Sequence, residues 1–377
     1  MSTTHDVIVV GAGIIGAAIA RELGRRGARV RVFESRVVGA GATHASAGVL
    51  APYIEGSSRG PLLDLAVRSL HLYDGFIAGL REDSGVDVEY RRCGTLEVAM
   101  DEASADRLRA SAGSLQSAGA SWLDAAAVRA AERALPESVM GGLLVEAHGY
   151  VAAAQLAETL MWAALRFGAE LETGRKIVAI SGTASGVEVT SEDGSRWSCD
   201  SVVVATGSWA AQSGLADPAV HAVRPVRGQL LRLAWQAEPL EHVVWGPDCY
   251  IVPWRDGTIL VGATVEEVGF DERTTAAGVR DLLGALCELL PAAWGATFVE
   301  ARAGLRPGTD DGLPIIGPSG VPGVTYATGH FRNGILLAPL TASLVADLVL
   351  EQRVDPALES VSPARFARRQ AGGAPQP

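Results

Sequence analysis

Apolar positions near the start of the chain change from a strand-like run to helical spacing and back. Asp6–Val10 is an apolar run, and a glycine-rich turn, Gly11–Gly16, follows it directly. A helical pattern then extends to about Leu23, and a second strand, Ala28–Phe33, ends on Glu34. This order predicts a βαβ unit with an acidic residue at the tip of its second strand.

The turn of this unit has the glycine spacing of a dinucleotide-binding fold. Gly11 would form the tight turn, Gly13 would let the backbone approach a pyrophosphate, and Gly16 would let the helix pack on the strand. The pyrophosphate would bind free N–H groups at the helix N-terminus, and Glu34 would accept hydrogen bonds from a ribose diol. The alternative is a glycine-rich turn that serves packing only.

The segment after Glu34 is rich in small side chains. Val38–Pro52 contains too many Gly, Ala, Ser and Thr residues for a core helix and is too apolar for a solvated loop. Such a backbone can lie against a flat ligand, where larger side chains would intrude. A buried linker of small residues is the alternative interpretation.

Later patterns alternate between α/β signals and blocks of antiparallel strands. Helical spacing covers Pro61–Arg81 and Ala153–Phe167, and the apolar run Val202–Thr206 is typical of a buried parallel strand. Two antiparallel strands are predicted on either side of an Arg255–Gly257 turn, and a closing helix covers Gly334–Leu350.

These patterns predict an α/β fold in two discontinuous domains. A Rossmann-like dinucleotide-binding domain comprises residues 1–85, 146–215 and 302–365. A second domain, of α+β character with a discontinuous antiparallel sheet, comprises residues 86–145 and 216–301 and would bind the substrate. Residues 366–377 are expected to form a disordered tail.

Composition narrows the class of protein. Apolar residues make up 48% of the 377 residues and charged residues 20%, which excludes a disordered chain. The net charge of −11 argues against nucleic acid or an anionic membrane as a partner. Neither a signal peptide nor a long uncharged apolar run is visible, so we expect a cytoplasmic protein. The four cysteines lack metal-binding or disulfide spacing, and no metal site is expected.

Five motifs, spread over nearly the whole chain, occur together in one known superfamily. They are Gly11–Gly16, Ala45–Pro52, Cys249–Pro253, Gly304–Gly312 and Gly329–Pro339. With them the chain resembles the FAD-dependent D-amino-acid-oxidase and sarcosine-oxidase superfamily, and within it most closely the glycine oxidases of thiamine biosynthesis. The resemblance implies bound FAD and the D-amino-acid-oxidase architecture, which is like that of glutathione reductase. No cysteine follows Cys287, so the FAD should be held non-covalently.

The resemblance also implies a substrate pocket built around one arginine. Arg306, expected on a structured turn, would pair with the substrate carboxylate, and the Tyr250 hydroxyl would donate to the same group. Arg332 would lie near the pocket mouth. From the residues alone, Arg306 could instead form an ion pair with Glu300 or Asp310. Tyr250 could belong to the core, and Arg332 could brace the flavin-facing loop.

The pocket walls depart from the family pattern. Val49 and Val265 stand where the family often has methionine, and their smaller side chains could widen the pocket for substrates larger than glycine. Asp248 is the third residue expected to line this pocket.

Cofactor contacts are expected from several segments of the chain. The residues are Gly11, Gly13, Ile14, Ile15, Gly16, Glu34, Ser35, Arg36, Thr43, Ala47, Gly48, Val49, Leu50, Val178, Thr206, Gly207, Trp209, Arg306, His330, Phe331, Arg332, Asn333, Gly334, Ile335 and Leu336. The last of these begin a helix whose free N–H groups would face the negative charge of reduced flavin. Ordinary capping by Asn333 would use the same N–H groups and is the alternative.

An enzyme of this kind transfers a hydride from the α-carbon of a small amine to the flavin, and oxygen then yields hydrogen peroxide. The expected substrates are glycine, sarcosine and small D-amino acids. Glycine would give an imine, then glyoxylate and ammonia, for the thiazole branch of thiamine biosynthesis. The alternatives are a D-amino-acid dehydrogenase with another electron acceptor and a flavin-holding subunit without catalysis. The family suggests a homotetramer.

Overall fold

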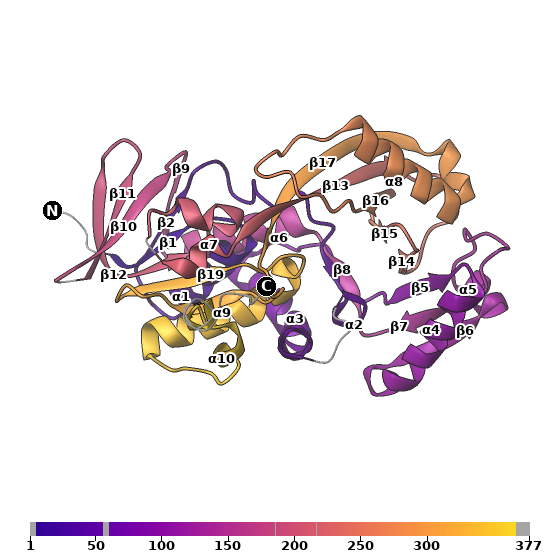
Figure 1. Ribbon diagram of the computed structural model, residues 1–377, viewed down its shortest axis with the longest axis horizontal. Coiled ribbons are helices and arrows are strands. Elements are labelled where there is room, and N and C mark those ends of the chain that lie inside the picture. The colour runs from indigo at the N-terminus through magenta and orange to yellow at the C-terminus, as the bar shows by residue number, and fades with distance from the viewer. Residues whose placement is uncertain (1–4, 56–59, 185, 216, 367–377) are drawn as a thin grey trace, which may run out of the picture.

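The computed structural model describes residues 5–55, 60–184, 186–215 and 217–366. These residues form two lobes that lie side by side along the longest axis of the molecule (Figure 1). The first lobe is built on a mostly parallel sheet, and the second on a mostly antiparallel one. Residues 367–377, which make up most of the predicted tail, lie outside the described residues.

The sheet of the first lobe has eight strands. Its order is β10-β11-β12-β1-β2-β9, and β19 pairs with both β12 and β18. The ladder that joins β9, β2, β1, β12 and β19 is parallel. Its strands β1 and β19 are buried on both faces, as expected for parallel strands. The strands are β1 (His5–Val10), β2 (Val30–Glu34), β9 (Glu170–Thr173), β10 (Ile177–Thr183), β11 (Gly186–Ser191), β12 (Arg196–Val204), β18 (Ile315–Pro318) and β19 (Val324–Thr328).

Four long helices pack together on one side of this sheet. They are α1 (Ile14–Arg25), α3 (Pro61–Ser84), α6 (Ala153–Arg166) and α9 (Gly334–Glu351). Side chains of β1 alternate between the two faces: Val7 and Val9 pack with the helices, and Ile8 and Val10 pack on the opposite side. By length and composition α9 could cross a membrane, but 61% of it is buried inside the protein, where it packs on α1 and α3.

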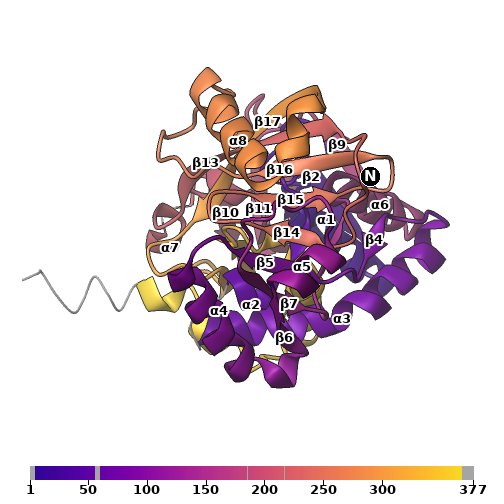
Figure 2. The same cartoon turned by 90° about the vertical axis from the view of Figure 1, so that its right-hand side faces the viewer.

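The second lobe also contains an eight-stranded sheet. Its order is β17-β13-β16-β15-β14-β5-β7-β6, and α8 (Ala276–Leu289) covers one face of it (Figure 2). Strands β15 and β16 are joined by the predicted Arg255–Gly257 turn. The strands are β5 (Thr95–Ala99), β6 (Ala120–Asp124), β7 (Gly141–Val145), β13 (Arg224–Ala234), β14 (Val243–Trp245), β15 (Tyr250–Pro253), β16 (Thr258–Gly262) and β17 (Thr297–Gly308).

Short elements complete the fold. A three-stranded sheet of order β3-β8-β4 joins segments from residues 49–50, 149–151 and 90–91. The remaining elements are β3 (Val49–Leu50), β4 (Tyr90–Arg91), β8 (Gly149–Val151), α2 (Pro52–Glu55), α4 (Glu102–Ser114), α5 (Ala125–Ala131), α7 (Pro218–His221), α10 (Leu358–Val361), η1 (Gln116–Ala118), η2 (Gly207–Gln212) and η3 (Pro291–Gly295).

One element differs from the sequence prediction in a way that concerns the site. Arg306 was expected on a turn, but it lies inside β17, which pairs with β13 along eleven residues of the latter. The glycines and the proline around Arg306 suggested a turn because they disfavour strands, and the long pairing with β13 overrides that preference. β17 also continues past residue 302, so it runs from one predicted domain into the other.

Candidate active site

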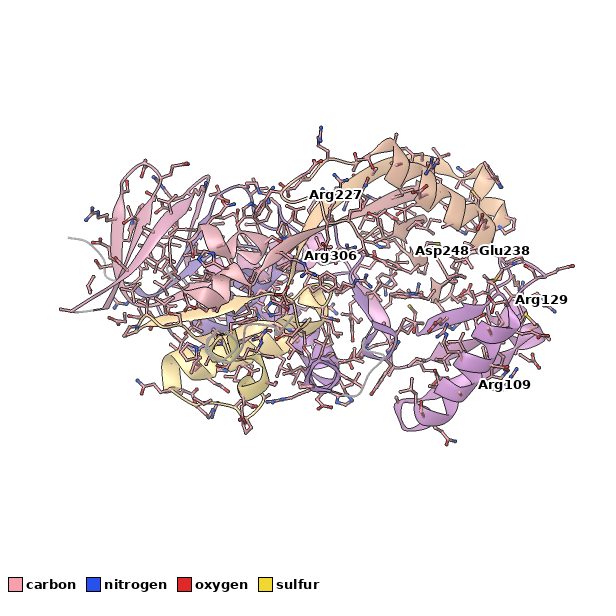
Figure 3. All side chains as sticks on the ribbon, viewed as in Figure 1. Arg109, Arg129, Arg227, Glu238, Asp248 and Arg306 are labelled. Atoms are coloured by element: carbon pink, nitrogen blue, oxygen red, sulfur yellow. The ribbon has the colours of Figure 1, made fainter. Side chains whose placement is uncertain are left out.

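A cavity of about 700 Å³ lies between the two lobes. The first lobe contributes the β1–α1 turn, the segment 41–49 and the start of η2, and the second contributes the ends of β14 to β17. Figure 3 labels Arg306 at the junction of the lobes, with Asp248 on the side of the second lobe. The cavity therefore joins the predicted dinucleotide site and the predicted substrate site.

The carboxylate of Glu34 is fixed at one end of this cavity. It accepts hydrogen bonds from the backbone N–H groups of Ala12 and Arg36, both at 2.8 Å. The Ser35 hydroxyl donates to the same carboxylate at 3.2 Å. An acceptor held in this way is suited to the hydroxyl groups of a ribose.

The β1–α1 turn depends on two glycines. Gly11 has a φ of +102°, and a Cβ atom there would lie 2.6 Å from the Ala205 carbonyl oxygen. A Cβ on Gly16 would lie 1.9 Å from the Gly11 carbonyl oxygen. The two glycines thus permit the tight turn and the close packing of α1 on it, while Gly13 lines the cavity.

The N-terminus of α1 is only partly occupied by protein groups. Its N-cap residue, Gly13, provides no side-chain hydrogen bond, and no acidic residue lies in the first turn. The Ile14 N–H, which was expected to be free, donates to the Thr43 hydroxyl at 3.0 Å. Thr206 lines the cavity, and its hydroxyl oxygen has no hydrogen-bond partner among the described residues. A helix start that is only partly capped and an unsatisfied hydroxyl fit a ligand with a pyrophosphate, such as FAD.

The turn before α9 forms another part of the wall. The Phe331 N–H donates to the Pro307 carbonyl at 3.0 Å, and Asn333, the N-cap of α9, provides no side-chain cap. The alternative of ordinary capping by Asn333 is therefore wrong. His330 lines the cavity and shares a 3.1 Å hydrogen bond with Thr341. Burial lowers the pKa of His330 to about 3, so this histidine is neutral at physiological pH.

Arg306 and Tyr250 line the other end of the cavity. Arg306 Nη1 donates to the carbonyl oxygens of Thr264, at 2.9 Å, and Arg227, at 3.3 Å. The Tyr250 ring packs against Trp245, with ring centroids 4.7 Å apart. Both side chains are half-buried and lie on the wall that the second lobe contributes.

The acidic residues considered as alternative partners of Arg306 have basic partners of their own. Glu300 pairs with Arg302 and with Arg232, and Asp310 pairs with Arg224 at 2.8 Å. Arg306 thus lies in the cavity wall, near backbone carbonyl groups, rather than on the surface beside these acids.

The pocket-wall residues differ in exposure. Val49 is half-buried, whereas Val265 is 52% exposed and Asp248 is exposed, and all three line the cavity. Arg332 is also an exposed lining residue. Cys249 lies beside them, and burial raises the pKa of its thiol to about 12, so the thiol is protonated.

The cavity wall includes most of the predicted cofactor contacts, but not all of them. Five do not reach it: Gly16, Leu50, Val178, Asn333 and Leu336. Sequence reasoning missed other lining residues, among them Trp245, Arg175, Lys176, Ile177, Ala263 and Glu272. Trp245 pairs with Tyr250 across β14 and β15, and this position could have been predicted from the hairpin register. Glu272 lies on an irregular segment, and the sequence around it carries no comparable signal.

The fold and the cavity together define a flavin-dependent oxidoreductase. The chain matches the model of the FAD dependent oxidoreductase family DAO over residues 6–348, and it belongs to this family. Glycine oxidase from Geobacillus kaustophilus is 37% identical over 354 residues, which cover 93% of this chain and 94% of that protein. The crystal structure of glycine oxidase from Geobacillus kaustophilus superimposes with a TM-score of 0.88 at 35% identity, over 96% of this chain and 98% of that one.

A second group of relatives consists of longer proteins. The bifunctional protein ThiO/ThiG from Synechocystis is 37% identical over 372 residues, which cover 97% of this chain. The chain spans about half of that relative's length (55%). These comparisons confirm the family predicted from the sequence, its α/β fold class and its FAD cofactor.

Proposed function

We propose that this protein oxidises glycine and other small amines with oxygen, and that glycine yields glyoxylate, ammonia and hydrogen peroxide. The observation that carries the proposal is the position of Arg306 and Tyr250 at one end of a cavity whose other end forms a dinucleotide cradle. Similarity to glycine oxidases over 93% of the chain supports it.

In this proposal the protein supplies binding and orientation. The Arg306 guanidinium pairs with the substrate carboxylate, and the Tyr250 hydroxyl donates a hydrogen bond to it. Trp245 and Val49 form apolar walls that exclude water from the α-carbon. Bound FAD supplies the electron chemistry by accepting a hydride from that carbon. A substrate amine that enters neutral needs no protein base.

The substrate range and the setting of the reaction belong to the same proposal. Sarcosine and small D-amino acids fit a pocket in which Val49 and Val265 replace larger side chains. The ThiO/ThiG relatives support a place in the thiazole branch of thiamine biosynthesis. We propose that the protein is cytoplasmic and forms a homotetramer. Light scattering of the purified protein tests the number of subunits.

An anaerobic experiment tests the chemistry. The flavin absorbance of the purified protein is followed with glycine, sarcosine or D-alanine, and air is then admitted. Bleaching by glycine, followed by recolouring with peroxide formation, is expected. Bleaching without recolouring would indicate a dehydrogenase, and no bleaching at all would contradict amine oxidation.

Arg306→Ala tests the carboxylate site. Loss of two hydrogen bonds between charged groups, at about 1.5–3 kcal/mol each, predicts a fall in kcat/KM for glycine of at least about 100-fold. Arg224→Ala is the matched control, because this arginine lies on β13 of the same sheet, is exposed, and pairs with Asp310. Equal kcat/KM values for Arg306→Ala and the control would show that Arg306 does not bind the substrate carboxylate.

A further inference from the structure

One face of the antiparallel sheet brings Arg306 close to a glycine of the neighbouring strand. In the register of β13 and β17, Val226 pairs with Arg306 and Gly228 pairs with Gly304. Gly228 is therefore the diagonal neighbour of Arg306. Residues two apart on a strand share a face, so Arg306 and Gly228 lie on the same side of the sheet.

Tyr250 reaches the same face from the other side of β13. Gly262 of β16 pairs with Leu230 of β13 and with Tyr250 of β15. Since Leu230 is two residues from Gly228, Gly262 and Tyr250 also lie on this face. The face looks toward the cavity, because both Gly262 and Tyr250 line it.

Each glycine lies directly beneath one of the two side chains. A Cβ atom on Gly228 would lie 2.2 Å from Cζ, Nη1 and Nη2 of Arg306. A Cβ atom on Gly262 would lie 2.5 Å from the hydroxyl oxygen of Tyr250 and 2.6 Å from its Cζ. The guanidinium and the phenol thus fill the space that a side chain at either position would need.

A left-handed backbone conformation does not account for these glycines. Neither Gly228 nor Gly262 has a φ in the left-handed region. A glycine within a regular element costs about 0.5–1 kcal/mol relative to alanine, because more backbone freedom is lost on folding. A glycine inside a strand often marks the close approach of another group, and here that group is Arg306 or Tyr250.

We propose that Gly228 and Gly262 are positioning residues that set where Arg306 and Tyr250 meet the substrate carboxylate. The inference rests on the proposed function of that pair. The space above Gly228 lets the guanidinium lie flat on the sheet, where it donates to the carbonyls of Thr264 and Arg227. In Gly228→Ala, the new Cβ atom would lie 2.2 Å from the guanidinium atoms. An ordinary contact is about 3.5 Å, so the guanidinium has to move away from both carbonyls.

The test uses the FAD-loaded enzyme and a ligand that has the carboxylate of glycine but no amine. Glycolate is titrated into the oxidised protein, and its Kd is read from the change in flavin absorbance. Gly228→Ala should raise this Kd roughly 10- to 100-fold, the value of one hydrogen bond to a charged group. Gly262→Ala should raise it roughly 10-fold through Tyr250. Gly284→Ala, on an exposed position of α8 with no atom near its Cβ, is the control and should match wild type.

A double-mutant cycle separates positioning from a general loss of stability. If Gly228 acts through Arg306, Gly228→Ala combined with Arg306→Ala binds glycolate no more weakly than Arg306→Ala alone. Additive losses of affinity in the double variant overturn the inference. It is also overturned if Gly228→Ala binds glycolate like wild type while Arg306→Ala binds it more weakly. An Arg306→Ala protein with normal affinity overturns the proposed function instead, and the inference falls with it.

Retention of FAD and the circular dichroism spectrum establish that each variant folds. If Gly228→Ala loses FAD, the same cycle is run with Gly262→Ala and Tyr250→Phe. Non-additive losses in that pair support the inference, and a Gly262→Ala protein with wild-type affinity overturns it.

Discussion

The substitution Glu34→Gln should weaken FAD binding by roughly 30-fold or more while the protein still folds. The Glu34 carboxylate accepts hydrogen bonds from the backbone N–H groups of Ala12 and Arg36, each at 2.8 Å. These bonds fix the carboxylate at the cavity wall, where a ribose diol would donate to it. The substitution keeps the size of the side chain and removes its charge.

The magnitude follows from the change of acceptor. A hydrogen bond to a charged group contributes about 1.5–3 kcal/mol, and one between neutral groups contributes about 0.5–1.5 kcal/mol. With two hydroxyl donors, the loss is at least about 1 kcal/mol for each, or at least about 2 kcal/mol in total, because the amide nitrogen of glutamine accepts no hydrogen bond. This free energy corresponds to a roughly 30-fold higher Kd for FAD.

The assay is a titration of the apoprotein with FAD, followed by quenching of the flavin fluorescence. Asp6→Asn is the matched control, because Asp6 accepts a hydrogen bond from the Arg29 N–H at 2.8 Å but does not line the cavity. It should lower the stability of the β1–β2 pair and leave the Kd for FAD unchanged. A Kd for Glu34→Gln that equals that of the control would refute the role of Glu34 at the ribose.

Three further predictions concern the cavity wall and its surroundings. Glu272→Gln breaks a partly exposed 3.0 Å ion pair with Arg36 and should raise the Kd for FAD no more than about fivefold, an effect that added salt removes in the same titration. Val265→Met narrows the pocket and should lower kcat/KM for D-alanine relative to glycine roughly tenfold; an equal loss for both substrates would contradict a role in selection. Burial lowers the pKa values of His148 and His330 to about 3, so the unfolded chain takes up protons between pH 6.5 and 3 that the native protein does not. Stability should therefore fall as the pH falls through this window, by about 1.4 kcal/mol per pH unit for each histidine, and thermal unfolding of His148→Gln should show a shallower pH dependence than wild type.

Much of the first lobe could be predicted because its signals are local. The apolar run, the glycine turn and the acidic residue at 34 lie within the first forty residues, and they form β1, α1 and β2. The spacing of Gly11, Gly13 and Gly16 reflects contacts within the same short unit, so one sequence suffices to interpret it.

The second lobe was harder to predict because its contacts are distant in sequence. β14 lies between β15 and β5, and β5 comes from a segment about 150 residues earlier in the chain. The strand that contains Arg306 is stabilised by β13, and glycine and proline residues within β17 conceal it from propensity arguments. Gly228 likewise gives no local signal, since its role is visible only once β17 is placed beside it.

The position of Arg306 relative to the cofactor depends on one strand that contacts both lobes. The carbonyl of Leu305 accepts a hydrogen bond from the Ser208 hydroxyl at 2.9 Å, and the carbonyl of Pro307 accepts one from the Phe331 N–H at 3.0 Å. Both donors belong to cavity-lining segments of the first lobe, and the two acceptors flank Arg306. A displacement of about 1 Å can cost about 100-fold in rate. Hydrogen bonds on either side of Arg306 restrict such a displacement of the arginine. The backbone of the Gly304–Gly312 motif thus fixes Arg306, the proposed carboxylate ligand, relative to the part of the first lobe that lines the cavity.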